Sequence, residues 1–99
     1  MQDLDVAIDD YLHTIVRSQP WIKKQEEAAL LAFSEWLYDQ QLSRALTTVG
    51  PELTARYATV AGLSVADHEA LDRALGHVFA WAQYQHEVTA NPFLAAISA

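Results

Sequence analysis

The sequence contains no cysteine, only three glycines and three prolines, and fewer than half as many basic as acidic residues. Without cysteine there is no disulfide bridge and no thiolate metal site. No apolar run approaches the roughly 20 residues that a membrane span requires, and the acidic start differs from the basic start of a secretory signal. We therefore expect a soluble protein, with the reducing cytoplasm as the compatible location.

The chain has 99 residues, which suits one domain, and 52% of them are hydrophobic. That fraction is enough to close a core without disulfides or metals. Thirteen acidic residues against six basic ones give a net charge of −7, which repels nucleic acid and anionic membranes unless the basic residues gather on one face. The placement of the few basic residues therefore decides whether this protein can bind a polyanion.

Apolar residues recur at the three- and four-residue spacing of a helix in four segments of the chain. The segments run from Asp3 to about Ser18, from Trp21 to about Gln41, from Pro51 to Gly62 and from Ser64 to about His86. The fourth segment has two apolar stripes where the others have one, and two stripes imply a central helix. No segment shows the strict alternation of a strand, so the sequence predicts an all-α fold, with four helices in an antiparallel-type bundle.

Prolines, glycine and short polar residues mark the helix boundaries. Pro20 and Pro51 suit a first helical turn, because no amide hydrogen is needed there. Gly62 suits a C-terminal stop. Either Ser64 or Asp67 can cap the fourth helix, because a short side-chain oxygen accepts from the free amide groups of the first turn.

The remaining segments are predicted to be irregular. Residues 42–50 lose the helical pattern and read as a connection, and residues 93–99 are too short for an independent element after Asn91–Pro92. Leu53, Tyr57 and Val60 are predicted to form the inner side of the third helix.

The histidines and acidic residues do not form a catalytic or metal-binding motif. Asp9 and His13 lie one helical turn apart and residues 67–69 read Asp-His-Glu, but neither group has the three converging ligands of a metal site. The adjacent acids Glu26 and Glu27 point in different helical directions, so solvated faces account for them better than a carboxylate pair. No activated nucleophile or glycine-rich phosphate loop is present. We predict no catalytic residue, no metal and no cofactor.

Lys23 and Lys24 form the only adjacent basic pair and follow Trp21 at the start of the second helix. Amide groups at a helix N-terminus attract phosphate, and an aromatic ring beside two cations suits nucleic acid or a partner protein. Each residue also has a purely structural interpretation. Trp21 can staple the helix start, and Lys23 can pair with Glu27 one turn further on.

The order of motifs resembles the N-terminal core-binding domain of phage integrases and related tyrosine recombinases. The residues that carry the resemblance are Leu30, Phe33, Trp36, Leu37, Leu53, Tyr57, Gly62, Leu63, Ser64, Asp67, Leu71, Leu75, residues 78–82 and residues 88–92. The closing Asn91–Pro92 pair is the most specific of them, because in that family it stands just before the linker to the catalytic domain. The resemblance implies a four-helix SAM-like bundle over residues 1–92, with residues 93–99 starting the linker and all catalytic residues in a separate domain.

In that family the second and fourth helices approach duplex DNA, and the catalytic domain binds the opposite side of the duplex. The DNA-facing residues that the resemblance implies here are Trp21, Lys23, Lys24, Arg44, His68, Arg73 and His77. The implied partners are double-stranded DNA and other recombinase protomers, with no membrane involved.

Two features depart from the family pattern. Ile22 and Asp67 stand close to places where family members usually carry threonine. Acidic residues also crowd the two helices expected at DNA, namely Glu26, Glu27, Asp67, Glu69 and Asp72. Few phosphate contacts are then left to release counterions. The alternative function is a helical protein–protein interaction module that has lost DNA binding; a small helical enzyme has no set of residues to support it.

Overall fold

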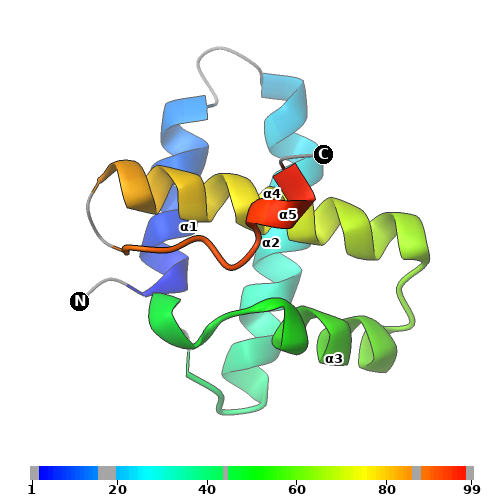
Figure 1. Cartoon of the computed structure of the whole chain (residues 1–99). Helices are drawn as coiled ribbons and strands as arrows, with labels where there is room; N and C mark the ends of the chain where they lie inside the picture. Colours follow the sequence, from blue (N-terminus) through cyan, green and yellow to red (C-terminus); the bar gives the residue numbers. More distant parts are fainter. Residues whose placement is uncertain (1–2, 16–19, 44, 86–87, 98–99) are drawn as a thin grey trace.

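The computed structural model describes residues 3–15, 20–43, 45–85 and 88–97, except for the side chains at 15, 20–23 and 25 (Figure 1). Its helices are α1 (Leu4–Ile15), α2 (Pro20–Asp39), α3 (Pro51–Ala61), α4 (Val65–Tyr84) and α5 (Leu94–Ile97), and a 3-10 turn, η1 (Leu46–Thr48), lies between α2 and α3. Within these ranges there is no strand, only an isolated bridge between Asp3 and Ala45. The predicted all-α class is confirmed for this part of the chain.

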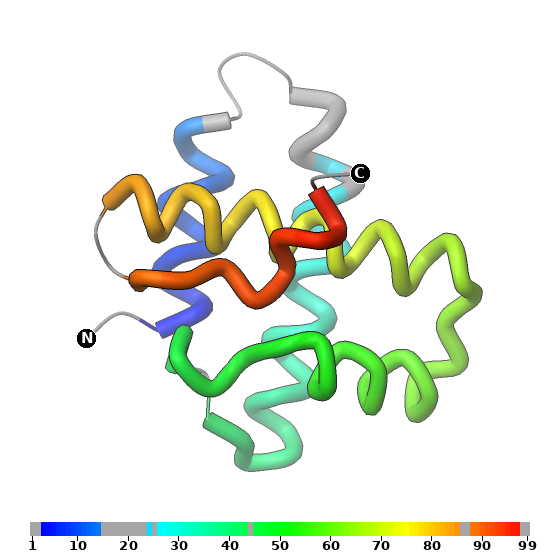
Figure 2. Tube along the Cα trace, viewed as in Figure 1, coloured from blue at the N-terminus to red at the C-terminus, as the bar shows by residue number. Residues whose placement is uncertain are grey.

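The helices form two crossed pairs. In Figures 1 and 2, α1 and α2 run side by side in opposite directions, and α4 lies across both of them. α3 runs back along α4 and contacts the far end of α2, while α5 packs on α4. This arrangement differs from the predicted antiparallel-type bundle, because α4 runs across α1 and α2 instead of alongside them.

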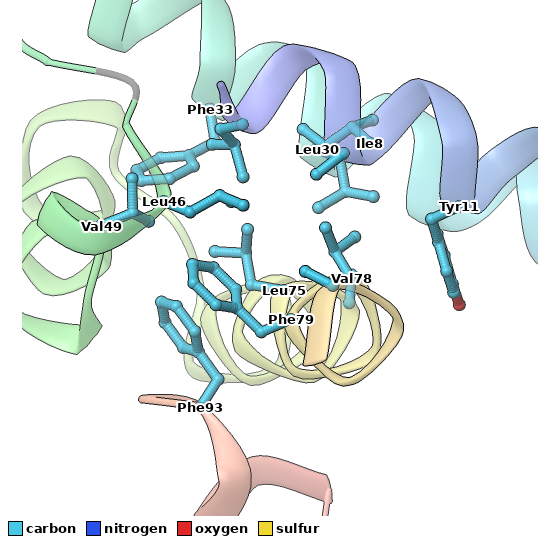
Figure 3. Close-up of a cluster of buried hydrophobic side chains, with 14 of the residues drawn as sticks. Ile8, Tyr11, Leu30, Phe33, Leu46, Val49, Leu75, Val78, Phe79 and Phe93 are labelled. Carbon is cyan, nitrogen blue, oxygen red and sulfur yellow. The ribbon is translucent and has the colours of Figure 1, made fainter. Parts of the chain in front are cut away.

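The core fills the space where the helices cross (Figure 3). Its largest fully buried apolar side chains are Leu4, Ile8, Leu30, Phe33, Leu37, Leu71, Leu75, Val78, Phe79 and Phe93. Burying each such side chain stabilises the fold by about 1.5–3 kcal/mol. α4 also buries Ala74, Gly76 and Ala82, so its predicted place as the central helix is confirmed.

The helix boundaries follow the predicted capping residues. Gly62 has a φ of 67° and its amide donates to the carbonyl of Ala58, which ends α3 in the left-handed conformation that glycine favours. Of the two predicted caps for α4, Ser64 is the one used, because its Oγ accepts from the amide of Asp67 at 3.1 Å. Pro51 lies in the first turn of α3.

The inner side of α3 differs from the prediction. Val60 is 68% exposed, while Thr54 and Ala58 are buried and Leu53 and Tyr57 are half-buried. The threonine is tolerated inside because its hydroxyl donates to the Pro51 carbonyl at 3.0 Å, so no polar group is left without a partner. The buried side is therefore centred on Thr54 and Ala58, beyond which Val60 points to solvent.

Both segments predicted to be irregular contribute to the core. Leu46 and Val49 are buried in the connection between α2 and α3. Phe93, at 2% exposure, packs against Phe79 with ring centroids 5.5 Å apart, and α5 follows it directly. The core thus extends one residue past the predicted domain boundary at residue 92. No helix in the described ranges is both long and apolar enough to cross a membrane.

Candidate nucleic-acid interface on α2 and α4

The predicted DNA-facing residues lie mainly on two helices that pack against each other. Lys24 is exposed on α2 and Arg73 is exposed on α4. Trp21 and Lys23 belong to α2, but their side chains are outside the described residues, as is the whole of Arg44. The remaining two predicted residues, both histidines, are half-buried on α4.

The structure places the two histidines on different sides of α4. His68 and His77 are nine residues apart, which is two and a half helical turns, so their side chains leave the helix in opposite directions. His77 faces α1 and α2, where it meets Tyr11 and Glu26. His68 instead lies beside Asp72 of its own helix, with 3.5 Å between Nε2 and Oδ2. A single flat surface cannot use both histidines equally.

A cleft of about 500 Å³ opens along α4 where α5 and the start of α3 meet it. Its polar lining consists of Glu69, Asp72 and Arg73, with Phe93 and neighbouring apolar residues completing the wall. Two carboxylates against one guanidinium give this cleft a negative balance, and negative charge repels phosphate. Arg73 lines this acidic cleft and is also exposed to solvent.

On the other side of α4, three helices meet in a polar cluster of Tyr11, Glu26 and His77. The Tyr11 hydroxyl donates to the Glu26 carboxylate, at 3.0 Å from Oε2 and 3.2 Å from Oε1. His77 Nδ1 lies 3.6 Å from Glu26 Oε2, and the rings of Tyr11 and His77 stack with centroids 6.4 Å apart. We call this group the Tyr11–Glu26–His77 cluster.

The cluster is partly shielded from water. Only 14% of the Glu26 side chain is exposed, against 41% of the His77 side chain. Burial, and then the charge of Glu26 and its hydrogen bond, raise the pKa of Tyr11 well above its ordinary value. Tyr11 therefore keeps its proton at neutral pH and acts as a fixed donor to Glu26. His77 Nδ1 is buried and has no hydrogen-bond partner among the described residues.

The sequence did not reveal this cluster. Glu26 was predicted to be solvated, yet its side chain is mostly buried and accepts a hydrogen bond from the Tyr11 hydroxyl. In Figure 3, Tyr11 lies at the edge of the buried side chains. The only signal in the sequence is that a tyrosine on an inner face needs a partner for its hydroxyl, and nothing identifies a partner on another helix.

Part of the acidic excess lies on and just before the first helix. Four of the thirteen acidic residues, Asp3, Asp5, Asp9 and Asp10, lie in residues 3–15, which contain no lysine or arginine. Asp5 and Asp9 line a groove between α1 and α2 together with Glu27, and no residue of α4 takes part in it. Glu26 and Glu27 thus point in different directions, as predicted, one toward α4 and the other into this groove.

The described residues contain no group of three or more histidine, aspartate or glutamate side chains arranged to hold a metal ion. No protein-family model matches the chain, and no curated protein and no solved structure matches it either.

Proposed function

We propose that this chain is a DNA-binding domain of the core-binding type found in tyrosine recombinases, and that α2 and α4 lie along duplex DNA. The proposal depends chiefly on one observation: α2 and α4 pack together and each presents an exposed cation, Lys24 and Arg73. These are the two helices and two of the residues that the sequence resemblance assigns to DNA. Contacts of this kind to phosphate position a protein on the duplex without reading its sequence.

The Asn91–Pro92 motif supports the proposal because it has a definite physical role in this fold. Asn91 Nδ2 donates to the carbonyl of Gly76 at 2.9 Å, and Asn91 Oδ1 accepts from the amide of Phe93 at 2.9 Å. The side chain therefore turns the backbone and ties it to the middle of α4. In the family that the sequence resembles, the same motif stands just before the linker to the catalytic domain.

The distribution of charge supports weak binding by this domain. The acidic residues of α1 lie on a helix that the proposal does not place at DNA, so they act mainly through long-range repulsion, which salt screens over about 10 Å. Few cations remain to contact phosphate, and each contact contributes a slope of about 0.9 in a plot of log affinity against log salt. A separate catalytic domain would then supply most of the affinity of the whole recombinase.

A salt-dependent titration tests the proposal. The 99-residue chain is titrated into a fluorescently labelled duplex, and anisotropy is followed at about 50 mM and about 200 mM salt. Lys24→Ala and Arg73→Ala should each weaken binding and lower the salt slope by about 1. Arg56→Ala is the matched control, because it removes the same charge from an exposed residue of α3 that lies 6.0 Å over the Trp36 ring. An absence of binding at the lower salt concentration, or equal losses in all three variants, would overturn it.

A second candidate function, a protein-interaction module, is favoured by two exposed valines close to either end of the turn between α3 and α4. Val60 and Val65 are 68% and 76% exposed, so both side chains are available to contact a partner protein. This function predicts self-association in light scattering that Val60→Ser together with Val65→Ser abolishes. Lys24→Ala and Arg73→Ala would then have no effect on any binding.

A further inference from the structure

His77 differs from His68 in the origin of its acidic neighbour. The carboxylate beside His68 comes from Asp72, one turn along the same helix, whereas the carboxylate beside His77 comes from Glu26 on α2. The contact between Glu26 and His77 therefore lies between the two helices that are proposed to face DNA. The negative charge of Glu26 therefore acts directly on a ligand that approaches the junction of α2 and α4.

Tyr11 holds Glu26 in this position. Its hydroxyl reaches both carboxylate oxygens, at 3.0 and 3.2 Å, from the buried side of α1. Since Tyr11 itself is only 6% exposed, the phenol cannot swing away without leaving the core. Glu26 therefore has little freedom to turn its charge toward solvent, and Tyr11 acts as a positioning residue.

The half-exposed ring of His77 can be reached by an approaching phosphate, while the fixed, mostly buried carboxylate lies 3.6 Å from its buried Nδ1. A phosphate oxygen that contacts this ring comes within several ångströms of a second anion, and like charges at that distance repel. We infer that Glu26, held beside His77 by Tyr11, is a built-in repulsive element that limits the affinity of the α2–α4 surface for DNA phosphate. Repulsive elements of this kind restrict binding to partners that compensate for them elsewhere.

The inference rests on the proposed DNA-binding function, and charge-neutral variants of adjacent residues test it. Glu26→Gln keeps an oxygen that accepts from Tyr11 and removes the negative charge. Glu27→Gln removes the same charge one residue away, in the groove between α1 and α2. At about 50 mM salt, Glu26→Gln should tighten binding of the labelled duplex roughly tenfold, and Glu27→Gln by less than about threefold, because its charge is more distant and better screened.

A second pair of variants links the effect to His77. His77→Gln alone should change the affinity of the wild-type chain little, because Glu26 already weakens that contact. In the Glu26→Gln background the same substitution should remove most of the gain, which makes the two effects non-additive. Glu26→Ala and Glu27→Ala repeat the comparison if the glutamine variant unfolds, and circular dichroism establishes that each variant is folded.

The outcomes separate this inference from the function on which it rests. Equal gains in Glu26→Gln and Glu27→Gln, or a gain that survives His77→Gln, would overturn the repulsive role of Glu26 and leave DNA binding intact. If the wild type binds no duplex and the Glu26 variants also bind none, both proposals are wrong. Wild-type binding that Glu26→Gln tightens roughly tenfold, and that His77→Gln then weakens in that background, supports the inference most strongly.

Discussion

Two polar junctions join other segments to α4, and they differ in how many of their polar side-chain atoms have a hydrogen-bond partner. At the C-terminal junction, Asn91 uses its amide hydrogen on Gly76 and its oxygen on Phe93, and the Phe93 ring is buried. At the Tyr11–Glu26–His77 cluster, the buried Nδ1 of the histidine has no hydrogen-bond partner in the described part of the chain, and the side chain is 41% exposed. The first junction is closed, whereas the second keeps a half-exposed histidine side chain that a ligand can contact.

The closed junction should show the largest effect on stability. Phe93→Ala removes a fully buried ring that packs on Phe79, and truncations of this kind cost about 3–5 kcal/mol. Urea unfolding followed by circular dichroism measures the loss. Leu94→Ala, at a neighbouring side chain that is 55% exposed, should cost less than about 0.5 kcal/mol. Similar small losses in both variants would show that the chain beyond Pro92 does not belong to the domain.

The second largest loss of stability should come from removing the Asn91 hydrogen bonds at the same junction. Asn91→Ala leaves the Gly76 carbonyl and the Phe93 amide without their side-chain partner, which should lower the free energy of unfolding by about 2 kcal/mol. Thr89→Ala, at an exposed position two residues earlier, serves as the control in the same urea experiment. A loss no greater than that of the control would mean that water replaces both bonds freely.

A substitution in the Tyr11–Glu26–His77 cluster should lower the free energy of unfolding by less, and the size of the loss should depend on pH. Tyr11→Phe removes the donor to Glu26 and should cost about 1.5 kcal/mol at neutral pH, because bonds to charged groups are stronger than neutral ones but this one is partly exposed. The pKa of Tyr11 is raised in the folded state, so above about pH 10 the unfolded chain releases this proton while the folded chain keeps it. The difference in free energy of unfolding between the wild type and Tyr11→Phe should therefore be constant below about pH 10 and shrink above it.

Thermal unfolding of the wild type and Tyr11→Phe between pH 7 and pH 11 checks this expectation. Tyr84→Phe, at a tyrosine that is 74% exposed, is the control and should follow the wild type throughout. If the stability difference between the wild type and Tyr11→Phe grew with rising pH, the pKa of Tyr11 would not be raised in the folded state.

The smallest effect should come from the close approach of α5 to α4. A Cβ at Gly76 would lie 2.6 Å from Ile97 Cγ2 and 3.0 Å from the Phe93 carbonyl oxygen. Overpacking lowers the free energy of unfolding by about 1–3 kcal/mol, whereas alanine in place of glycine inside a helix raises it by about 1 kcal/mol. Gly76→Ala should therefore lower the free energy of unfolding by about 1 kcal/mol, measured by urea unfolding. Gly50→Ala, where nothing lies within 4 Å of the added carbon, should lower the free energy of unfolding only by about 0.5 kcal/mol, because alanine is a poorer N-cap of α3 than glycine. A stabilised Gly76→Ala would show that α5 moves aside easily.

Local features of the sequence allowed much of the fold to be predicted. The all-α class, the existence of the four long helices, the Gly62 stop and the central position of α4 are all present in the structure. These features depend on neighbours along the chain, through helical periodicity and capping, which is why they can be read without knowing the contacts. The burial of Val49 and Phe93, by contrast, depends on segments distant in sequence.

The candidate site was predictable only in part, for a physical reason. The sequence identified the basic residues and histidines of the two helices, and helical geometry alone places His68 and His77 half a turn apart. It could not show that Glu26 is held by Tyr11, which lies fifteen residues away on another helix. Contacts across helices depend on the crossing of α1, α2 and α4, and no local pattern encodes that crossing.

Local patterns were enough to predict that this protein is helical and where α3 and α4 are capped, and composition gives its large negative charge. The buried side of α3 and the acidic residue that faces α4 became visible only in the folded structure. The reason is that periodicity and capping act within a few residues, whereas burial and electrostatic pairing depend on distances between side chains that only the packed helices bring together.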